Sequence, residues 1–195
     1  MKSLVIFHEG KSIDKSFFEL LIKDIGEDPT KVEFYGVGSK SNFFKEDNVN
    51  YTELFLEIEE IDKILFILDA DYDKEKQFGG YENSLREIQK IQKSLGIADI
   101  SDTFIAYDKN SSTKEGYLES LILSSLTDEQ DDCIQSFLLK CPEFKGRNSH
   151  KSIFNIIYKN AYPKKPFNFK HKNFDELKEK LKKLFMVNEK EKQCV

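Results

Sequence analysis

The sequence predicts an α/β protein with an open, mostly parallel sheet of about four strands and helices on both faces. Strand-like and helix-like segments alternate up to about residue 126, which is typical of parallel strands joined by helical crossovers. The strongest strand, residues 62–71, contains the continuous apolar run ILFIL, as expected where helices cover both faces of a sheet. Beyond residue 126 the strand patterns stop, which indicates a helical C-terminal extension.

The first half of this alternation predicts two strands and two helices. Residues 3–8 (SLVIFH) are a short apolar run followed by glutamate and glycine, which favours a strand. Residues 12–26 predict a helix, because apolar residues recur along one helical face and Gly26 is suited to ending it. Residues 31–39 predict a second strand that runs into a turn, and residues 51–61 predict a short helix.

The second half repeats the pattern. The strand at residues 62–71 is followed by a polar loop and by a predicted helix at residues 81–95, with Gly96 at the position of a helix stop. Residues 102–108 (DTFIAYD) predict the fourth strand, and residues 114–126 predict the helix that follows it.

The C-terminal part predicts helices only. They are expected at residues 128–140, 150–161 and 173–185, the last with a clear apolar stripe among its lysines. We therefore predict an α/β domain at residues 1–126 and a helical, basic extension packed on it at residues 127–195.

Charge is distributed unevenly along the chain. Residues 1–139 carry 15 Lys and Arg against 29 Asp and Glu, whereas residues 140–185 carry 13 against 4. One interpretation is a metal-binding part joined to a phosphate-binding part. The other is a solvated helical surface, which is the commoner meaning of a lysine-rich helix.

Length and composition narrow the class of protein. A chain of 195 residues fits one domain, or one domain with a small appendage. It has no run of about 18 apolar residues, so no membrane span is expected. Three widely spaced cysteines without a CxxC pair indicate a reduced, cytoplasmic chain without a structural zinc site. The absence of GxxxxGK[ST] and GxGxxG gives no support to a P-loop ATPase or a dinucleotide-binding dehydrogenase.

Carboxylates follow the ends of three predicted strands. Glu9 follows the first strand, Asp69, Asp71 and Asp73 end or follow the third, and Asp108 follows the fourth. Ligands of open parallel sheets bind beyond these carboxyl ends. In an extended backbone Asp69 and Asp71 point the same way, and a cation would relieve their mutual repulsion.

Two interpretations of the three aspartates remain. Carboxylate oxygens without histidine or cysteine suit Mg²⁺, or Mn²⁺ in its place, and Glu9 at a neighbouring strand end favours this metal site. The alternative is an acidic loop in which aspartate forms turns or caps a helix.

Two of these segments carry a resemblance to a known family. HEGKSIDKSFFELL resembles the first motif of the Toprim domain, and LFILDADYD resembles its Asp-x-Asp motif. The resemblance covers about residues 3–125 and is closest to small stand-alone Toprim-like proteins of prokaryotes. It implies a Rossmann-like sheet, Glu9 as general acid/base or metal ligand, and Asp69 and Asp71 as Mg²⁺ ligands for phosphodiester chemistry.

The chain also departs from that family. Many Toprim domains have a glycine soon after Asp-x-Asp, whereas DYDKEKQFGG places a longer charged loop there. No topoisomerase tyrosine can be placed and no primase zinc domain is present, so neither of these identities is expected.

Further candidates lie outside the two motifs. Glu115 and Glu119 are predicted four apart on one helix and are candidates for a second ion, or else part of a solvated face. Lys11 is predicted near a helix N-terminus, where it either contacts phosphate or lies on the surface.

The basic stretch GRNSHKS is the last candidate. It places Arg147, His150 and Lys151 at a predicted helix start, as a phosphate clamp or as an ordinary beginning of a helix.

These observations predict a Mg²⁺-dependent protein that acts on phosphodiesters, most simply a nuclease on DNA or RNA. The alternative is a non-catalytic Toprim-like module that binds nucleic acid, a nucleotide or a protein. A defence or toxin component that works only with a partner, such as an ATPase, is a third possibility.

Overall fold

The computed structural model describes residues 3–10, 13–56, 58–71, 78–144, 149–163 and 167–186. Three of the predicted site residues, Lys11, Asp73 and Arg147, lie outside these ranges. The chain divides into two compact units. Unit 1 takes its described residues from Met1–Leu68, Glu82–Ile105 and Glu176–Val195, and unit 2 from Asp69–Tyr81 and Ala106–Asp175.

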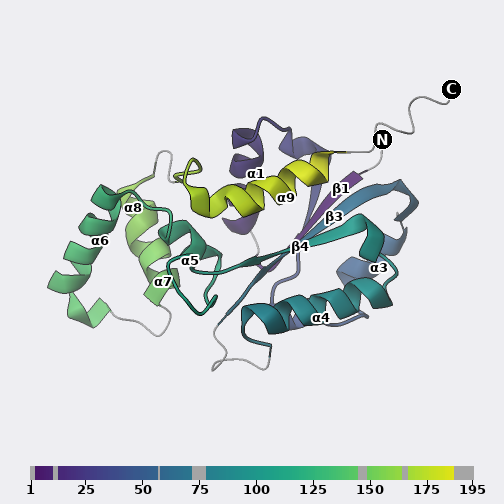
Figure 1. Ribbon diagram of the computed structural model, residues 1–195, viewed down its shortest axis with the longest axis horizontal. Coiled ribbons are helices and arrows are strands. Elements are labelled where there is room, and N and C mark those ends of the chain that lie inside the picture. The colour runs from purple at the N-terminus through teal and green to yellow at the C-terminus, as the bar shows by residue number, and fades with distance from the viewer. Residues whose placement is uncertain are drawn as a thin grey trace. The chain divides into compact units, whose positions relative to one another are not determined.

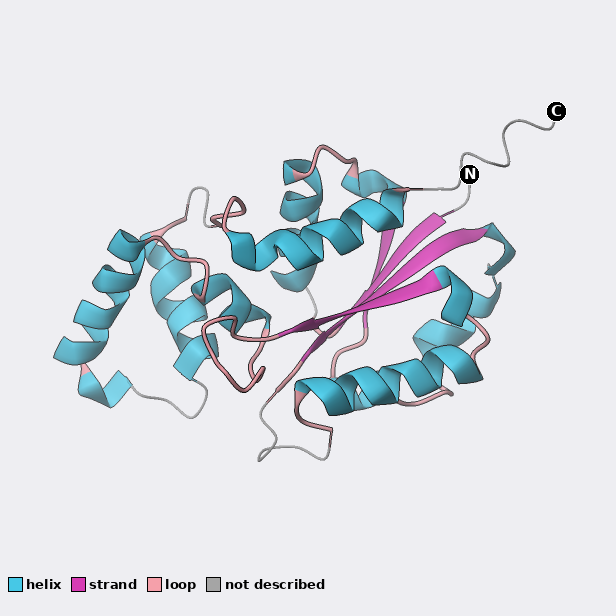
Figure 2. Ribbon diagram, viewed as in Figure 1, coloured by secondary structure: helices cyan, strands magenta, loops and turns pink. Residues whose placement is uncertain are grey.

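The predicted sheet is present. Four parallel strands form an open sheet in the order β2-β1-β3-β4, so β1 lies between β2 and β3. Figure 2 shows the strands as neighbouring magenta arrows. Their bounds are β1 Ser3–His8, β2 Val32–Gly36, β3 Ile61–Asp69 and β4 Ser101–Ala106.

Helices cover both faces of this sheet, as its apolar strands predict. Figure 1 shows α1 and α9 over one face and α3 and α4 over the other. The α-helices of unit 1 are α1 Ile13–Asp24, α2 Lys40–Phe43, α3 Val49–Leu56, α4 Tyr81–Ser94 and α9 Asp175–Phe185. Single turns of 3₁₀-helix are found at Pro29–Lys31, Ile58–Glu60 and Ala98–Ile100.

Aromatic residues form the centre of the unit 1 core. Phe7 of β1 is fully buried, and its ring centroid lies 5.1 Å from those of Phe66 and Tyr35, in stacked geometry. Tyr51 of α3 meets Phe7 edge-on at 5.4 Å. The sequence has 17 Phe and no Trp, and phenylalanine accordingly fills the space between strands and helices.

Lysines of α9 contact acidic residues of unit 1. Lys178 lies 3.0 Å from Asp24, and Lys180 lies 2.8 Å from Asp102. Lys63 of β3 donates to the backbone carbonyls of Lys183 and Met186 and so satisfies the end of α9. Part of the positive charge of this helix is therefore directed toward the protein itself.

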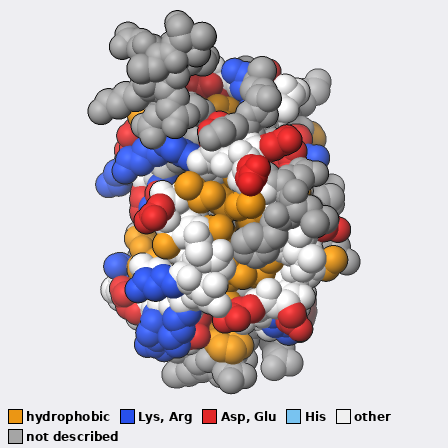
Figure 3. Space-filling view, turned by 90° about the vertical axis from the view of Figure 1, so that its right-hand side faces the viewer, with side chains coloured by type: hydrophobic (Ala, Val, Ile, Leu, Met, Phe, Trp, Pro, Cys, Tyr) orange, Lys and Arg blue, Asp and Glu red, His pale blue; other side chains and the backbone are white. Residues whose placement is uncertain are grey.

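Figure 3 shows the side from which the strands start, where acidic and basic side chains surround apolar ones.

Unit 2 is helical. It contains α5 Leu118–Leu123, α6 Asp128–Lys140, α7 Ser149–Ser152 and α8 Lys159–Ala161, with 3₁₀ turns at Pro142–Phe144 and Lys172–Phe174. The helix predicted at residues 150–161 is confirmed, and its middle part, Ile153–Tyr158, adopts π-helical geometry between α7 and α8. This wider turn places both Phe154 and Tyr158 in the core, with their rings stacked at 5.7 Å.

Two further observations concern organisation. The predicted domain boundary between residues 126 and 127 rests on a change of composition along the chain. Each compact unit of the structure is instead made of sequence segments that are not contiguous. The two-domain division at that position stays a prediction.

Within the described ranges no helix is both long and apolar enough to cross a membrane.

Two buried tyrosines differ in how their hydroxyls are satisfied. The Tyr51 hydroxyl donates to the Phe43 carbonyl at 2.7 Å, whereas the Tyr158 hydroxyl has no hydrogen-bond partner among the described residues. Burial raises the pKa of Tyr158 to about 12 from its ordinary 10.0. The folded state therefore favours the neutral hydroxyl of Tyr158. Because the pKa of this hydroxyl is 10.0 in the unfolded chain and about 12 in the fold, the stability that depends on the neutral form is lost as pH rises from 10 through about 12.

Replacing each of these tyrosines by phenylalanine is expected to have opposite effects. Tyr51→Phe removes the donor of a buried carbonyl and should lower the free energy of unfolding by about 1–2 kcal/mol. Tyr158→Phe removes a buried hydroxyl that has no hydrogen-bond partner in the described ranges, and it should raise the free energy of unfolding by about 1 kcal/mol. Urea unfolding followed by circular dichroism measures both. A loss of stability in both variants would contradict the expectation for Tyr158.

Candidate functional site

Asp69, the last residue of β3, belongs to unit 2 and contacts other residues of that unit. Its Oδ1 accepts a hydrogen bond of 2.8 Å from the backbone N–H of Leu118, the first residue of α5. Its Oδ2 lies 3.6 Å from the Nζ of Lys151 on α7. The residue is only 8% exposed. The Leu118 N–H and the Lys151 ammonium are thus both in contact with this nearly buried carboxylate.

Lys151 contacts an aromatic ring as well as a carboxylate. Its Nζ lies 4.2 Å from the centroid of the Tyr117 ring, in addition to its contact with Asp69. Because the lysine side chain is 36% exposed, its ammonium group also reaches solvent. The structure therefore places this predicted phosphate ligand beside a carboxylate, and its phosphate-binding role stays a prediction.

Asp71 does not continue the strand. Its φ of 58° lies in the left-handed region, which a residue other than glycine rarely adopts. Its backbone N–H donates to the Gly116 carbonyl at 2.8 Å and its carbonyl accepts from the Gly116 N–H at 3.3 Å, an antiparallel bridge. The extended backbone from which a common direction of Asp69 and Asp71 was expected therefore ends at Asp69 and does not reach Asp71.

The same bridge corrects the helix predicted at residues 114–126. The chain stays irregular through Tyr117, and α5 begins only at Leu118, since Lys114 and Gly116 have φ values of 49° and 131°. Glu115 and Glu119 consequently do not share a helical face. Glu119 lies in the first turn of α5, next to the residue that donates to Asp69.

Glu115 instead belongs to the loop after β4. Its Oε2 accepts a hydrogen bond from the Thr113 hydroxyl at 3.1 Å, and its carbonyl accepts from the backbone N–H of Asp108 at 3.0 Å. Asp108 in turn accepts the N–H of Asn110 at 2.9 Å through Oδ1, which closes a turn. Both carboxylates therefore shape this loop.

Glu9 lies in unit 1, immediately after β1. The register of the parallel pair β1 and β3 sets His8 opposite Ile67. The carbonyl of Glu9 accepts the N–H of Gly38 at 3.0 Å, in the turn after β2. The strand adjacency on which the predicted site depends is therefore present.

The predicted metal ligands have side chains that suit Mg²⁺, but the described ones are not grouped around a common point. All candidate ligands are carboxylates, which suits Mg²⁺ or Mn²⁺. Within the described ranges, however, no three His, Cys, Asp or Glu side chains are grouped so that they could hold one metal ion. A cation at Asp69 Oδ2 would have to displace the Lys151 ammonium, which now offsets the charge of this carboxylate.

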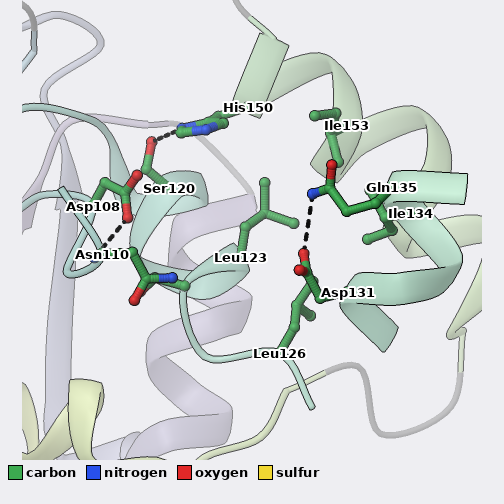
Figure 4. A pocket seen from close by; sticks show the side chains of 11 residues that line it. Asp108, Asn110, Ser120, Leu123, Leu126, Asp131, Ile134, Gln135, His150 and Ile153 are labelled. Carbon is green, nitrogen blue, oxygen red and sulfur yellow. Dashed lines mark hydrogen bonds between the residues drawn. The ribbon is translucent and has the colours of Figure 1, made fainter. Parts of the chain in front are cut away.

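His150 and Ser120 form a contact that the sequence did not reveal. The His150 Nδ1 lies 2.8 Å from the Ser120 Oγ, which also accepts the N–H of Tyr117 at 3.1 Å. Ser120 is buried in α5, thirty residues away in sequence, and no pattern marks it. The pair lines a cavity of about 220 Å³ in unit 2 (Figure 4). The predicted phosphate ligand His150 thus faces a hydroxyl.

Comparisons with models of protein families, with curated proteins and with solved structures found no match. The resemblance to the Toprim domain therefore stays a prediction from the two motifs.

Proposed function

We propose that this chain is a Toprim-like, Mg²⁺-dependent protein that acts on phosphodiesters, most simply a nuclease on DNA or RNA. The observation that supports this most is the position of Asp69 at the carboxyl end of β3 in a parallel sheet. In this sheet β1 is the neighbour of β3, and Glu9 directly follows β1. Sites in open α/β sheets form at this edge.

The proposed roles follow from charge and position. Asp69 and Asp71 would hold the ion, and Glu9, Asp73 and Glu119 are the other predicted ligands. A bound Mg²⁺ would neutralise charge on the phosphate and activate a water molecule. Glu9 serves as the general acid/base that moves the proton of the attacking water or of the leaving oxygen.

Basic residues complete the proposal by binding phosphate. The exposed part of Lys151 allows its ammonium to turn from Asp69 to a phosphate oxygen. His150, Lys11 and Arg147 are the further candidates. The partner in this proposal is nucleic acid, and the location is the cytoplasm.

A cleavage assay tests the proposal. The wild-type protein is incubated with single- and double-stranded DNA and RNA in Mg²⁺ or Mn²⁺. Glu9→Gln and Asp69→Asn should each lower the rate by at least about 100-fold, since even groups that only support a metal ligand contribute 10–100-fold. Asp132→Asn, an exposed change on α6, is the matched control and should keep full activity. Equal activity of all four proteins would falsify the proposal.

One observation favours a second candidate, a non-catalytic Toprim-like binding module. Asp69 is already neutralised by Lys151, and no group of three metal-ligating side chains exists in the described part of the chain. Calorimetry with Mg²⁺ separates the two. Binding weaker than about 1 mM, the weakest range of dedicated sites for hard cations, together with no cleavage, would support the module.

A further inference from the structure

The cavity beside Ser120 and His150 lies wholly within unit 2. Its volume of about 220 Å³ is below the range of about 300–1,000 Å³ that is usual for drug-sized ligands. It therefore fits a single ring system or a group of similar size. Figure 4 shows side chains from α5, α6 and the start of α7 directed around this space.

The described lining of the cavity carries carboxylates. Among the residues that the structure describes, the lining includes two carboxylates, Asp108 and Asp131, and no lysine or arginine. An anionic group would be repelled here. The two carboxylates favour a group that is neutral or positively charged and that offers hydrogen-bond donors.

Apolar and polar side chains occupy different depths of the cavity. Ile134 and Ile153 are buried and Leu123 is half-buried, so they form an apolar wall. Asn110, Asp131 and Gln135 are exposed and lie at the rim. An apolar wall suits the face of a flat ring, and the polar rim suits its hydrogen-bonding edge.

The donor pattern at the rim selects among flat rings. An ionised carboxylate only accepts hydrogen bonds, through two neighbouring oxygens. Guanine offers two adjacent donors, N1–H and the N2 amino group, on its pairing edge. Adenine, cytosine and uracil each combine a donor with a neighbouring acceptor there. Asp131 already accepts an N–H of Gln135 at 3.2 Å, which shows that its carboxylate can receive donors in this place.

The wall of the cavity at Ser120 is fixed in advance. Ser120 is held by the N–H of Tyr117 and by the ring of His150, so the histidine has a set orientation. Ser124 donates to the Leu121 carbonyl at 2.7 Å. Because Ser120, Ser124 and His150 already have hydrogen-bond partners, this wall does not need to be ordered on binding, which favours affinity.

We propose that this cavity binds a guanine base, with Asp131 accepting the two donors of its pairing edge. This inference rests on the proposed function in one respect: the guanine would be part of the nucleic acid on which the protein acts. Guanine binding itself needs neither metal nor cleavage, so each idea can fail alone.

Calorimetric or NMR titration of the full chain in EDTA tests this with guanosine, adenosine, cytidine and uridine. Guanosine should bind saturably and at least about 10-fold more tightly than the others, the size of a good two-bond discrimination between bases. Asp131→Asn should weaken guanosine binding by at least about 10-fold. Asp132→Asn, a neighbour on α6 that does not line the cavity, should leave it unchanged.

A second arm identifies the source of the base. Guanosine monophosphate is compared with single-stranded oligonucleotides that contain one guanine or none, and preference for the guanine-containing strand supports a nucleic-acid ligand. Equal binding of all four nucleosides, or no loss on Asp131→Asn, would overturn the inference. Cleavage without guanosine binding overturns the inference alone, whereas guanosine binding without cleavage overturns only the proposed nuclease.

Discussion

Replacing Phe7 by alanine is expected to lower the free energy of unfolding of unit 1 by about 4 kcal/mol. Phe7 is fully buried, and its ring meets Phe66, Tyr35 and Tyr51 at centroid distances of 5.1, 5.1 and 5.4 Å. Truncation removes its buried area and leaves a cavity between rigid rings on neighbouring elements. Such changes cost about 3–5 kcal/mol where the site cannot collapse.

Urea unfolding followed by circular dichroism measures this loss. Phe137→Ala is the control, because this phenylalanine of α6 is 39% exposed and should cost much less. Phe7→Leu keeps most of the volume and should recover more than half of the stability. Equal losses for Phe7→Ala and Phe137→Ala would show that the ring cluster is not the centre of the core.

Replacing Gly116 by alanine is expected to cost unit 2 more than about 3 kcal/mol. Its φ of 131° is outside the regions that alanine adopts, and a Cβ would lie 2.9 Å from the backbone nitrogen of Asp108. That nitrogen is fixed by its hydrogen bond to the Glu115 carbonyl, so it has no easy way to move. The same Cβ would lie 3.0 Å from the Ser120 side chain.

Gly96→Ala separates backbone strain from crowding. Gly96 also has a positive φ, 68°, but no atom lies within 4 Å of the place of a Cβ, so only the strain of about 1–2 kcal/mol is expected. Hydrogen exchange should show faster opening around the Asp71–Gly116 bridge in Gly116→Ala and not in Gly96→Ala. Protection of this bridge equal to wild type in both variants would contradict the steric argument.

Most of the fold could be predicted because its signals are local. The apolar run of β3 ends in the sequence where the strand ends in the structure, within two residues. Gly26 and Gly96 have positive φ and follow α1 and α4, as the predicted helix stops require. Hydrophobic period and glycine positions are properties of neighbouring residues, and packing did not override them here.

The site was less predictable because its geometry depends on contacts between distant residues. Apolar spacing predicted a helix through Glu115, but the bridge between Asp71 and Gly116 holds that segment irregular. Pairing with a segment more than forty residues away decided the local backbone. Ser120 was missed for the same reason, since its contact with His150 exists only once α5 and α7 pack.

By itself, the sequence determined the parallel α/β core, its approximate strand ends and the carboxylates that follow them, because periodicity and residue type act along the chain. The tertiary structure alone decided which groups meet these carboxylates. It gave Asp69 the N–H of Leu118 and the ammonium of Lys151, and it turned Asp71 out of the strand. A buried carboxylate must be compensated by a hydrogen-bond donor or a cation. Which group does this depends on the packing of elements that are distant in sequence, so the sequence pattern does not reveal it.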